Sequence, residues 1–378
     1  MLVRLVSVVA LSATIANAHL AAWHKGMYGL NGVSGSINYN SDDVVHPLYQ
    51  MSKSDWWFHG YNGVPNFPPA EGDFLELPAG GSFTVEIASN RGETSLGFNG
   101  KYATSWPDGK NYPEDYNVPT CITSPNMHTQ NQSRAAGTAF AISYTSDIKK
   151  VTPENLAVFT VRYHTPWKRL TSYDVPADMP ACPSGGCICA WGWVPNGCGQ
   201  PNMYHLPYRC KVTGAKSTKA IGPAKAPVWC ENNAGGCTKG PKQMIYWNQN
   251  EGNNIRVDGW DAAGDPKSPA YNSKCGFPDG AQYDIFTGGT SSPPSNPPPS
   301  SNDDNKPSSN ADKSSSNTDK SASTDTQKKV ATTSNTSSSS SDPAPKCEKR
   351  SHRKRRADMQ ARANSVTFHR RRHAHHGL

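Results

Sequence analysis

Long apolar runs are scarce in this sequence of 378 residues. Beyond residue 15, no run approaches the length that crosses a bilayer, so we expect neither a membrane span nor a membrane partner. Apolar residues at helical spacing are equally scarce, which argues against a helical domain. Net charge is small before Lys346, where the charges sum to about −1, and this argues against a nucleic-acid partner.

The first eighteen residues have the pattern of a secretory signal peptide. A short basic start ends at Arg4, an apolar segment follows at 5–15, and Ala16-Asn17-Ala18 forms an A-x-A cleavage site. The chain has ten cysteines, which fits an oxidising compartment where cysteines pair. We therefore expect a secreted, extracellular protein whose mature form begins at His19.

An N-terminal histidine offers a metal two nitrogens, its α-amine and its ring Nδ1. Their reference pKa values, about 7.7–8.0 and about 6.5, let copper displace protons from both near neutral pH. The alternative is that histidine follows the cleavage site by chance. A stable site needs a third nitrogen, and the candidate histidines of the folded part are His24, His46, His59, His128, His164 and His205.

The middle of the chain has the pattern of short strands joined by long loops. Apolar residues alternate at 83–87 and 140–144, and 156–161 is a β-rich run. Glycine and proline clusters such as 183–186 separate these runs. The pattern predicts a mainly β fold, an immunoglobulin-like or fibronectin-III-like antiparallel β-sandwich with long disulfide-held loops at 19–286.

Nine of the ten cysteines fall in this predicted domain, so one is either free or pairs with Cys347. Residues 287–345 are rich in Ser, Pro and Asn and predict a disordered linker. Residues 346–378 form a basic, His-rich tail with eleven Lys and Arg against two acids. Such a tail suits proteolytic trimming, capture of stray copper, or binding to acidic surfaces.

Two separated motifs resemble one known family. HLAAWHKGMYG at 19–29 and ACPSGGCICAWGW at 181–193 are similar to auxiliary activity family 14, the secreted fungal copper-dependent lytic polysaccharide monooxygenases. The resemblance covers roughly residues 19–280 and leaves out the tail. It implies a histidine brace, in which the amine and Nδ1 of the first histidine and a second imidazole hold one copper ion. Imidazole and amine ligands suit copper.

The resemblance also implies roles for individual residues. His128 matches the second imidazole ligand, and His164 is the rival candidate. Tyr204 matches the axial tyrosine, with Tyr208 as the alternative because residues four apart on a strand share a face. Related families place a glutamine two residues before that tyrosine, but here the position is Asn202, with Gln200 further back. The identity of this outer amide therefore stays open.

The implied reaction is oxidative cleavage of polysaccharide glycosidic bonds, on xylan associated with cellulose. It requires an external electron donor and dioxygen or hydrogen peroxide. Trp56, Trp57 and Tyr61 lie in one loop-like stretch and are candidates to stack on sugar rings, although core packing is the competing reading. Asn131 and Asn335 begin sequons for N-glycosylation.

Two other functions fit the same residues. A protein with the brace could bind copper without oxidative turnover, and a metal-free protein of this composition could bind carbohydrate or serve the cell wall. The axial tyrosine and reductant-dependent release of oxidised oligosaccharides distinguish the enzyme from both alternatives. In each case we expect a monomer.

Overall fold

The computed structural model describes residues 19–122, 124–125, 127–195, 201–260 and 267–287. These residues all fall in one compact unit, Met1–Asn302, and the second unit, Asp303–Leu378, lies outside them. Several predicted features also lie outside the described residues. They are the signal peptide, Gln200, the sequon at Asn335, the linker from residue 288 and the basic tail.

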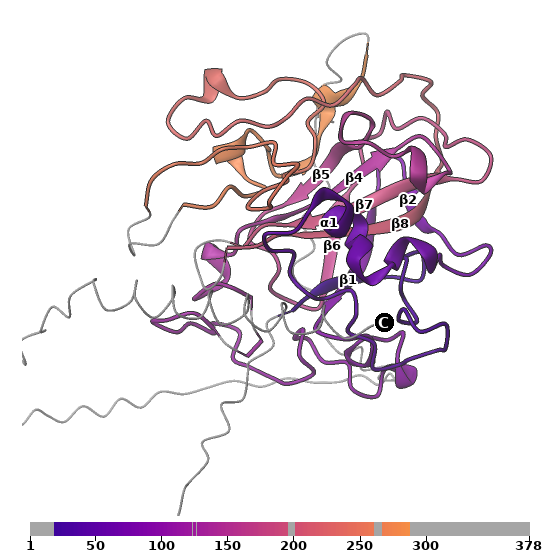
Figure 1. Ribbon diagram of the computed structural model, residues 1–378, viewed down its shortest axis with the longest axis vertical. Helices are drawn as coiled ribbons and strands as arrows, with labels where there is room; N and C mark the ends of the chain where they lie inside the picture. The colour runs from indigo at the N-terminus through magenta and orange to yellow at the C-terminus, as the bar shows by residue number, and fades with distance from the viewer. Residues whose placement is uncertain (1–18, 123, 126, 196–200, 261–266, 288–378) are drawn as a thin grey trace, which may run out of the picture. The chain divides into compact units, whose positions relative to one another are not determined.

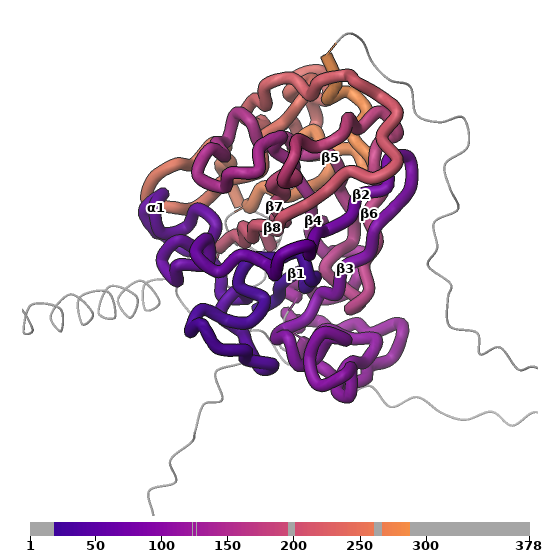
Figure 2. The backbone as a smooth tube through the Cα atoms, turned by 90° about the vertical axis from the view of Figure 1, so that its right-hand side faces the viewer, coloured from indigo at the N-terminus to yellow at the C-terminus, as the bar shows by residue number. Residues whose placement is uncertain are grey.

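The described chain is built from two sheets (Figure 1). The smaller sheet has the order β1-β3-β6 and is antiparallel. Its strands are β1 (Ala21–Trp23), β3 (Ser82–Ala88) and β6 (Leu170–Asp174). Figure 2 shows β1 lying beside β3, so the segment that begins at His19 runs directly into this sheet.

The larger sheet has the order β2-β8-β7-β4-β5-β9. Its strands are β2 (Leu75–Pro78), β4 (Thr138–Ser143), β5 (Ala157–Arg162), β7 (Cys187–Trp193), β8 (Tyr204–Thr213) and β9 (Gly280–Ala281). All neighbours are antiparallel except β2 and β8, which pair in parallel at the edge. The sequence pattern did not predict this parallel pair, because alternation of apolar residues carries no information on strand direction.

The two sheets pack face to face through aromatic side chains. Phe83 of β3 lies 5.0 Å, centroid to centroid, from Phe140 of β4, and Tyr173 of β6 lies 4.9 Å from the same ring. Phe83, Val85 and Ile87 are buried while Ser82 and Thr84 are exposed, as the alternation predicted. The prediction of a mainly β sandwich is confirmed.

Helices are short throughout the described part. They are α1 (Lys53–Trp56) and the 3-10 turns η1 (Trp57–Asn62), η2 (Val64–Asn66), η3 (Arg91–Glu93), η4 (Phe98–Gly100), η5 (Gln132–Arg134), η6 (Ile148–Lys150), η7 (Pro153–Asn155), η8 (Ala234–Gly236), η9 (Ser273–Cys275) and η10 (Tyr283–Ile285). Within the described ranges, none of these helices has the length and apolar character of a membrane span.

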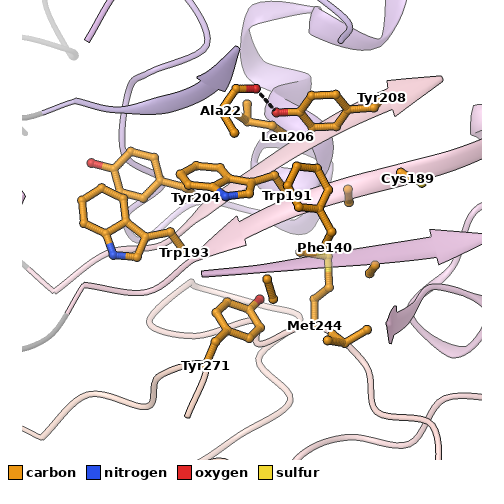
Figure 3. Packing of buried hydrophobic residues seen from close by; sticks show 14 of the residues in the cluster. Ala22, Phe140, Cys189, Trp191, Trp193, Tyr204, Leu206, Tyr208, Met244 and Tyr271 are labelled. Carbon is orange, nitrogen blue, oxygen red and sulfur yellow. Dashed lines mark hydrogen bonds between the residues drawn. The ribbon is translucent and has the colours of Figure 1, made fainter. Parts of the chain in front are cut away.

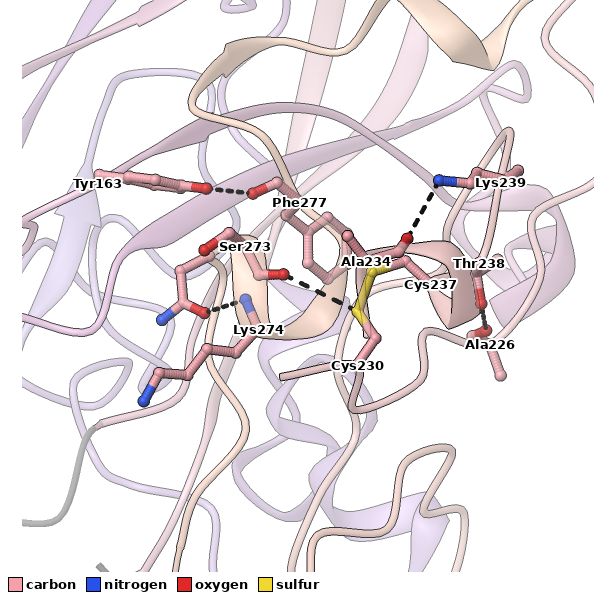
Figure 4. Close-up of a disulfide and its surroundings, with 11 residues drawn as sticks. Tyr163, Ala226, Cys230, Ala234, Cys237, Thr238, Lys239, Ser273, Lys274 and Phe277 are labelled. Carbon is pink, nitrogen blue, oxygen red and sulfur yellow. Dashed lines mark hydrogen bonds between the residues drawn. A yellow bond between two sulfur atoms is a disulfide. The ribbon is translucent and has the colours of Figure 1, made fainter. Parts of the chain in front are cut away.

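Disulfides hold the loops, as the cysteine content predicted. The described pairs are Cys182–Cys187, Cys189–Cys210 and Cys230–Cys237, the last of which is drawn in Figure 4. Cys121 is also disulfide-bonded. Cys275 is a free, buried thiol, and burial raises its pKa to about 11.

Candidate metal centre

Four strands of the larger sheet end or begin in one row. Tyr204 begins β8 and pairs with Trp193, which ends β7; Trp193 pairs with Thr138, which begins β4. Thr138 in turn pairs with Arg162, which ends β5. We call this row the site edge. Loops leave the sheet here, and long loops on a rigid scaffold are where binding residues gather.

Tyr204 and Trp193 occupy one face of the site edge. Their rings stack at 4.6 Å between centroids with an interplanar angle of 20° (Figure 3). Directly opposite residues of neighbouring strands point to the same face, so this contact follows from the register. Both side chains are almost fully buried, and burial raises the pKa of the Tyr204 phenol above its usual range.

His128 lies on the loop that leads into β4. Its ring centroid is 5.5 Å from that of Trp193 in an edge-on arrangement, and only 6% of the residue is exposed. Its φ of 50° lies in the left-handed region, which is uncommon for a residue with a side chain. Trp193 therefore contacts both His128 and Tyr204. The structure thus brings two of the predicted ligands to the same tryptophan ring.

His19 reaches the same region through a second loop. Its ring lies 5.0 Å from that of His46, and two residues further on Leu48 pairs with Met203. The two backbone hydrogen bonds of that pair are 2.9 and 3.1 Å long. Since Met203 immediately precedes Tyr204, the loop of His46 connects His19 to the start of β8.

The two tyrosines between which the sequence could not choose for the axial role, Tyr204 and Tyr208, have different surroundings. The Tyr208 hydroxyl donates a hydrogen bond to the carbonyl oxygen of Ala22, so its polar atom is used between the two sheets (Figure 3). Tyr208 also packs its ring on Phe140, 5.4 Å away in the core. Tyr204 lies at the site edge with Trp193, which favours it over Tyr208 for the axial role.

The rival ligand His164 lies elsewhere along the site edge. It is exposed and follows the end of β5, whereas His128 contacts Trp193 of β7, the neighbour of the strand that carries Tyr204. This placement favours His128. Asn202 is buried two residues before Tyr204, where the outer amide was expected.

The remaining histidines are buried or hydrogen-bonded within the fold, which indicates structural roles. His24 accepts a hydrogen bond at Nδ1 from the Gly26 amide, and burial lowers its pKa to about 4. His59 and His205 are buried, which lowers the pKa of each to about 3. His46 was among the candidate histidines, but the sequence did not predict its contact with His19, because this contact joins positions 27 residues apart.

The structure corrects one proposed sugar-binding residue. Trp56 is fully buried, and its indole N–H donates to the Glu251 carbonyl at 2.9 Å, so its ring cannot stack on a sugar at the surface. Trp57 is half-buried against Phe58, with centroids 4.8 Å apart. Of the three candidates only Tyr61 is well exposed, at 40%.

Asn131, the first predicted glycosylation site, is half-buried. Its side-chain oxygen accepts hydrogen bonds from the Ser133 hydroxyl at 2.8 Å and the Arg134 amide at 3.2 Å. Its side-chain nitrogen donates to the Asn117 side chain at 3.3 Å. A glycan on this nitrogen would have to keep or replace that contact, and glycosylation here stays a prediction.

The donor set suits copper better than other metals. The candidates supply imidazole nitrogens, an amine that exists only once the chain is cut before His19, and a neutral phenol. Within the described ranges there is no group of three or more His, Cys, Asp or Glu side chains that could hold an ion. A brace requires only two such side chains, because the terminal amine provides the third nitrogen.

Comparison with known proteins identifies the family. A family model described as "Lytic polysaccharide monooxygenase AA14" matches residues 1–376. AA14 family lytic polysaccharide monooxygenase A of Trametes coccinea (strain BRFM310) is 37% identical over 293 residues, covering 75% of this chain and 64% of the relative. The chain thus spans less than two thirds of that relative's length.

Two further relatives agree. The B proteins of the same family from Pycnoporus cinnabarinus and Talaromyces rugulosus are 36% and 37% identical over 291 and 307 residues. These matches cover 74% and 75% of this chain, and 72% and 98% of the relatives. The chain belongs to the AA14 family of lytic polysaccharide monooxygenases, copper-dependent oxidoreductases, as its two sequence motifs had indicated.

Proposed function

We propose that the chain is secreted, begins at His19 after processing, and cleaves polysaccharide glycosidic bonds oxidatively at one copper ion. His19 would bind the ion through its amine and Nδ1, and His128 through a ring nitrogen. Bound copper would supply one-electron redox chemistry with an external electron donor and dioxygen or hydrogen peroxide. The observation that supports this most is the contact of Trp193 with both His128 and Tyr204.

The protein's own residues would hold this site rigid. Trp193 fixes the ring of His128 from one side, and the strand register fixes Tyr204 opposite Trp193. Because burial raises the pKa of Tyr204, its side chain stays a neutral phenol unless a metal displaces the proton. His46 packs on His19 and would restrict the orientation of the first ligand's ring.

We further propose xylan on cellulose as the substrate and an exposed aromatic surface as its binding site. Tyr39, Phe98 and Tyr102 are 44%, 38% and 49% exposed. The ring centroid of Phe98 lies 5.5 Å from that of Tyr39 and 5.4 Å from that of Tyr102. Neighbouring exposed rings suit the apolar faces of sugar rings. The loop of Phe98 follows β3, whose last residue pairs with Ala21, two residues from His19.

The copper site is tested by EPR of the Cu(II)-loaded protein, cut after residue 286 to remove the His-rich tail. The matched control carries one extra residue before His19. We expect a one-copper, three-nitrogen spectrum that collapses in the control, because the extra residue converts the amine into an amide. Identical spectra from the two proteins would exclude the brace.

The reaction is tested by adding a reductant and xylan-coated cellulose and measuring oxidised oligosaccharides. Copper binding without such products would leave a copper-binding protein. For the aromatic surface, Tyr39→Ala with Tyr102→Ala should weaken binding to the solid substrate several-fold. Ile37→Ala is the control, because Ile37 is 65% exposed on the same loop but carries no ring. Equal losses in both variants would argue against ring stacking.

A further inference from the structure

A cavity of about 310 Å³ opens near the site edge, lined by residues from several separate segments. They include Arg134, Tyr163, His164, Trp229, Lys267 and Lys274. We propose that this cavity binds a uronic acid, a sugar with a carboxylate, carried by the polysaccharide that reaches the metal centre. The proposal rests on the proposed function only for the identity of the polysaccharide.

The cavity belongs to the same edge of the sheet as the metal centre. Tyr163 and His164 directly follow Arg162, the residue that closes the row from Tyr204 through Trp193 and Thr138. Neighbouring strands are about 4.8 Å apart, so the row from β8 to β5 spans about 14 Å. A sugar chain that runs along this row would place different units over the metal centre and over the cavity.

The loop between His128 and β4 connects the proposed metal centre directly to the cavity. Arg134 lies six residues after His128, and η5 (Gln132–Arg134) turns the chain between them. The Asn131 side chain caps this turn by accepting a hydrogen bond from the Arg134 amide at 3.2 Å. The position of the Arg134 backbone is therefore set by the same short segment that carries the predicted ligand.

The charge of the cavity differs from that of the domain around it. Residues 19–286 hold 21 Lys and Arg against 22 Asp and Glu, a net of −1. The cavity lining supplies Arg134, Lys267 and Lys274. One acid, Glu231, pairs with both lysines at 3.2 and 3.0 Å, and these contacts lower its pKa. Three cations against one carboxylate leave a local excess that suits one further carboxylate.

Aromatic side chains give the cavity a surface for a sugar ring. Trp229 is half-buried, and the Nζ atoms of Lys267 and Lys274 each lie 5.7 Å from its ring centroid. The Tyr163 hydroxyl donates to the Phe277 carbonyl at 2.6 Å, which fixes its ring (Figure 4). A ring face beside positive charge is the combination that recognises a pyranose with an acidic group.

The walls of the cavity are held in place before any ligand binds. The Cys230–Cys237 disulfide closes the loop after Trp229 (Figure 4). The Cys230 amide donates to the Lys274 carbonyl at 2.7 Å. Gly137, next to Ala136 of the lining, has a φ of 93°, and a Cβ there would lie 2.3 Å from the Tyr271 carbonyl oxygen. Only glycine allows the chain to approach Tyr271 this closely.

The test measures binding by calorimetry with soluble probes and needs no turnover. The probe is a xylo-oligosaccharide that bears one glucuronic acid, and the matched ligand is the same molecule with its carboxyl reduced to an alcohol. We expect the reduced ligand to bind about tenfold more weakly, since it loses a charge-assisted hydrogen bond. Trigalacturonate, with the acid in the main chain, shows which source of uronic acid fits better.

Variants locate the site of binding. Arg134→Gln, and separately Lys267→Gln with Lys274→Gln, should remove most of the preference for the acidic probe while leaving binding of the reduced ligand unchanged. The control is Lys219→Gln, because Lys219 pairs with Asp178 at 2.7 Å and does not line the cavity. Equal affinities for the acidic and reduced ligands, or a preference that survives all cavity variants, would overturn the proposal.

The expected preference of the cavity for the acidic probe does not depend on the metal centre. The protein with an extra residue before His19 should lose copper binding but keep its preference for the acidic probe. If the proposed oxidation fails while this preference persists, the cavity is an acidic-sugar site in a protein with another activity. If oxidation succeeds and the preference is absent, the cavity proposal alone is refuted.

Discussion

Acid should destabilise this domain through His59, and a single substitution should relieve the effect. His59 is fully buried, and among the described residues neither of its ring nitrogens has a hydrogen-bond partner. Burial, together with the nearby charge of His46, lowers its pKa from 6.5 to about 3. A protonated His59 is therefore poorly tolerated in the folded state.

The sign and size of the effect follow from proton linkage. Below pH 6.5 the unfolded chain binds a proton at His59 that the folded chain does not bind until about pH 3. The free energy of unfolding is therefore unaffected above pH 6.5 and falls as the pH drops towards 3. Each pH unit in this window costs about 1.4 kcal/mol, so the loss between pH 6.5 and 4.5 is roughly 2.7 kcal/mol.

The variant His59→Leu removes the titrating group with a side chain of similar volume. Because no hydrogen bond is lost, the substitution should be close to neutral at pH 7. At pH 4.5 the variant should be more stable than the wild type by roughly 2.7 kcal/mol, or about 5–10 °C in Tm for a domain of this size. Differential scanning calorimetry at several pH values between 7 and 4.5 measures this difference.

The control is His164→Leu. His164 has the same φ as His59, 55° in each case, but its side chain is exposed. Its substitution should leave the pH dependence of Tm unchanged. If the Tm values of His59→Leu and the wild type fall in parallel from pH 7 to 4.5, the account of a buried neutral histidine is wrong.

Three further outcomes are expected. Trp193→Ala should weaken copper binding in calorimetry and lower stability by about 3–5 kcal/mol, whereas Trp193→Phe, which keeps a ring between the ligands, should preserve most of the affinity. Cys275 should react with a thiol reagent only after unfolding, because it is buried and its pKa is raised to about 11; rapid labelling of the folded protein would contradict this. Replacing both Cys189 and Cys210 by serine should cost about 3 kcal/mol, measured by denaturant unfolding, since the disulfide closes a loop of 21 residues.

The sequence predicted the features that depend on local pattern. Alternation located β3 to within one residue and β4 to within two, and the cleavage site indicated His19 as a ligand candidate. The same reasoning left Trp56 open between stacking on a sugar and packing in the core, because its neighbours resemble a loop. The structure buries it against Tyr246, 5.0 Å away, from a segment 190 residues later in the chain. No local pattern reports such a contact.

The groups of residues that form the aromatic surface and the cavity were also beyond prediction from sequence. The aromatic surface joins Tyr39 to Phe98, and the cavity joins Arg134 to Trp229 and Lys274. Each residue alone is an ordinary polar or aromatic residue in a loop. Only the folded structure shows that these residues are neighbours.

The register between β7 and β8 links the fold to the proposed chemistry. The sheet pairs Trp193 with Tyr204 at the site edge, and the Cys189–Cys210 disulfide joins the same two strands further from it. A slip of one residue would turn Tyr204 to the opposite face of the sheet, away from Trp193 and His128. The disulfide opposes such a slip, because it fixes both strands at a second point. The motif at 181–193 therefore combines a structural requirement with the proposed functional one, since the strand that carries Trp193 also carries the cysteine that helps to set its register.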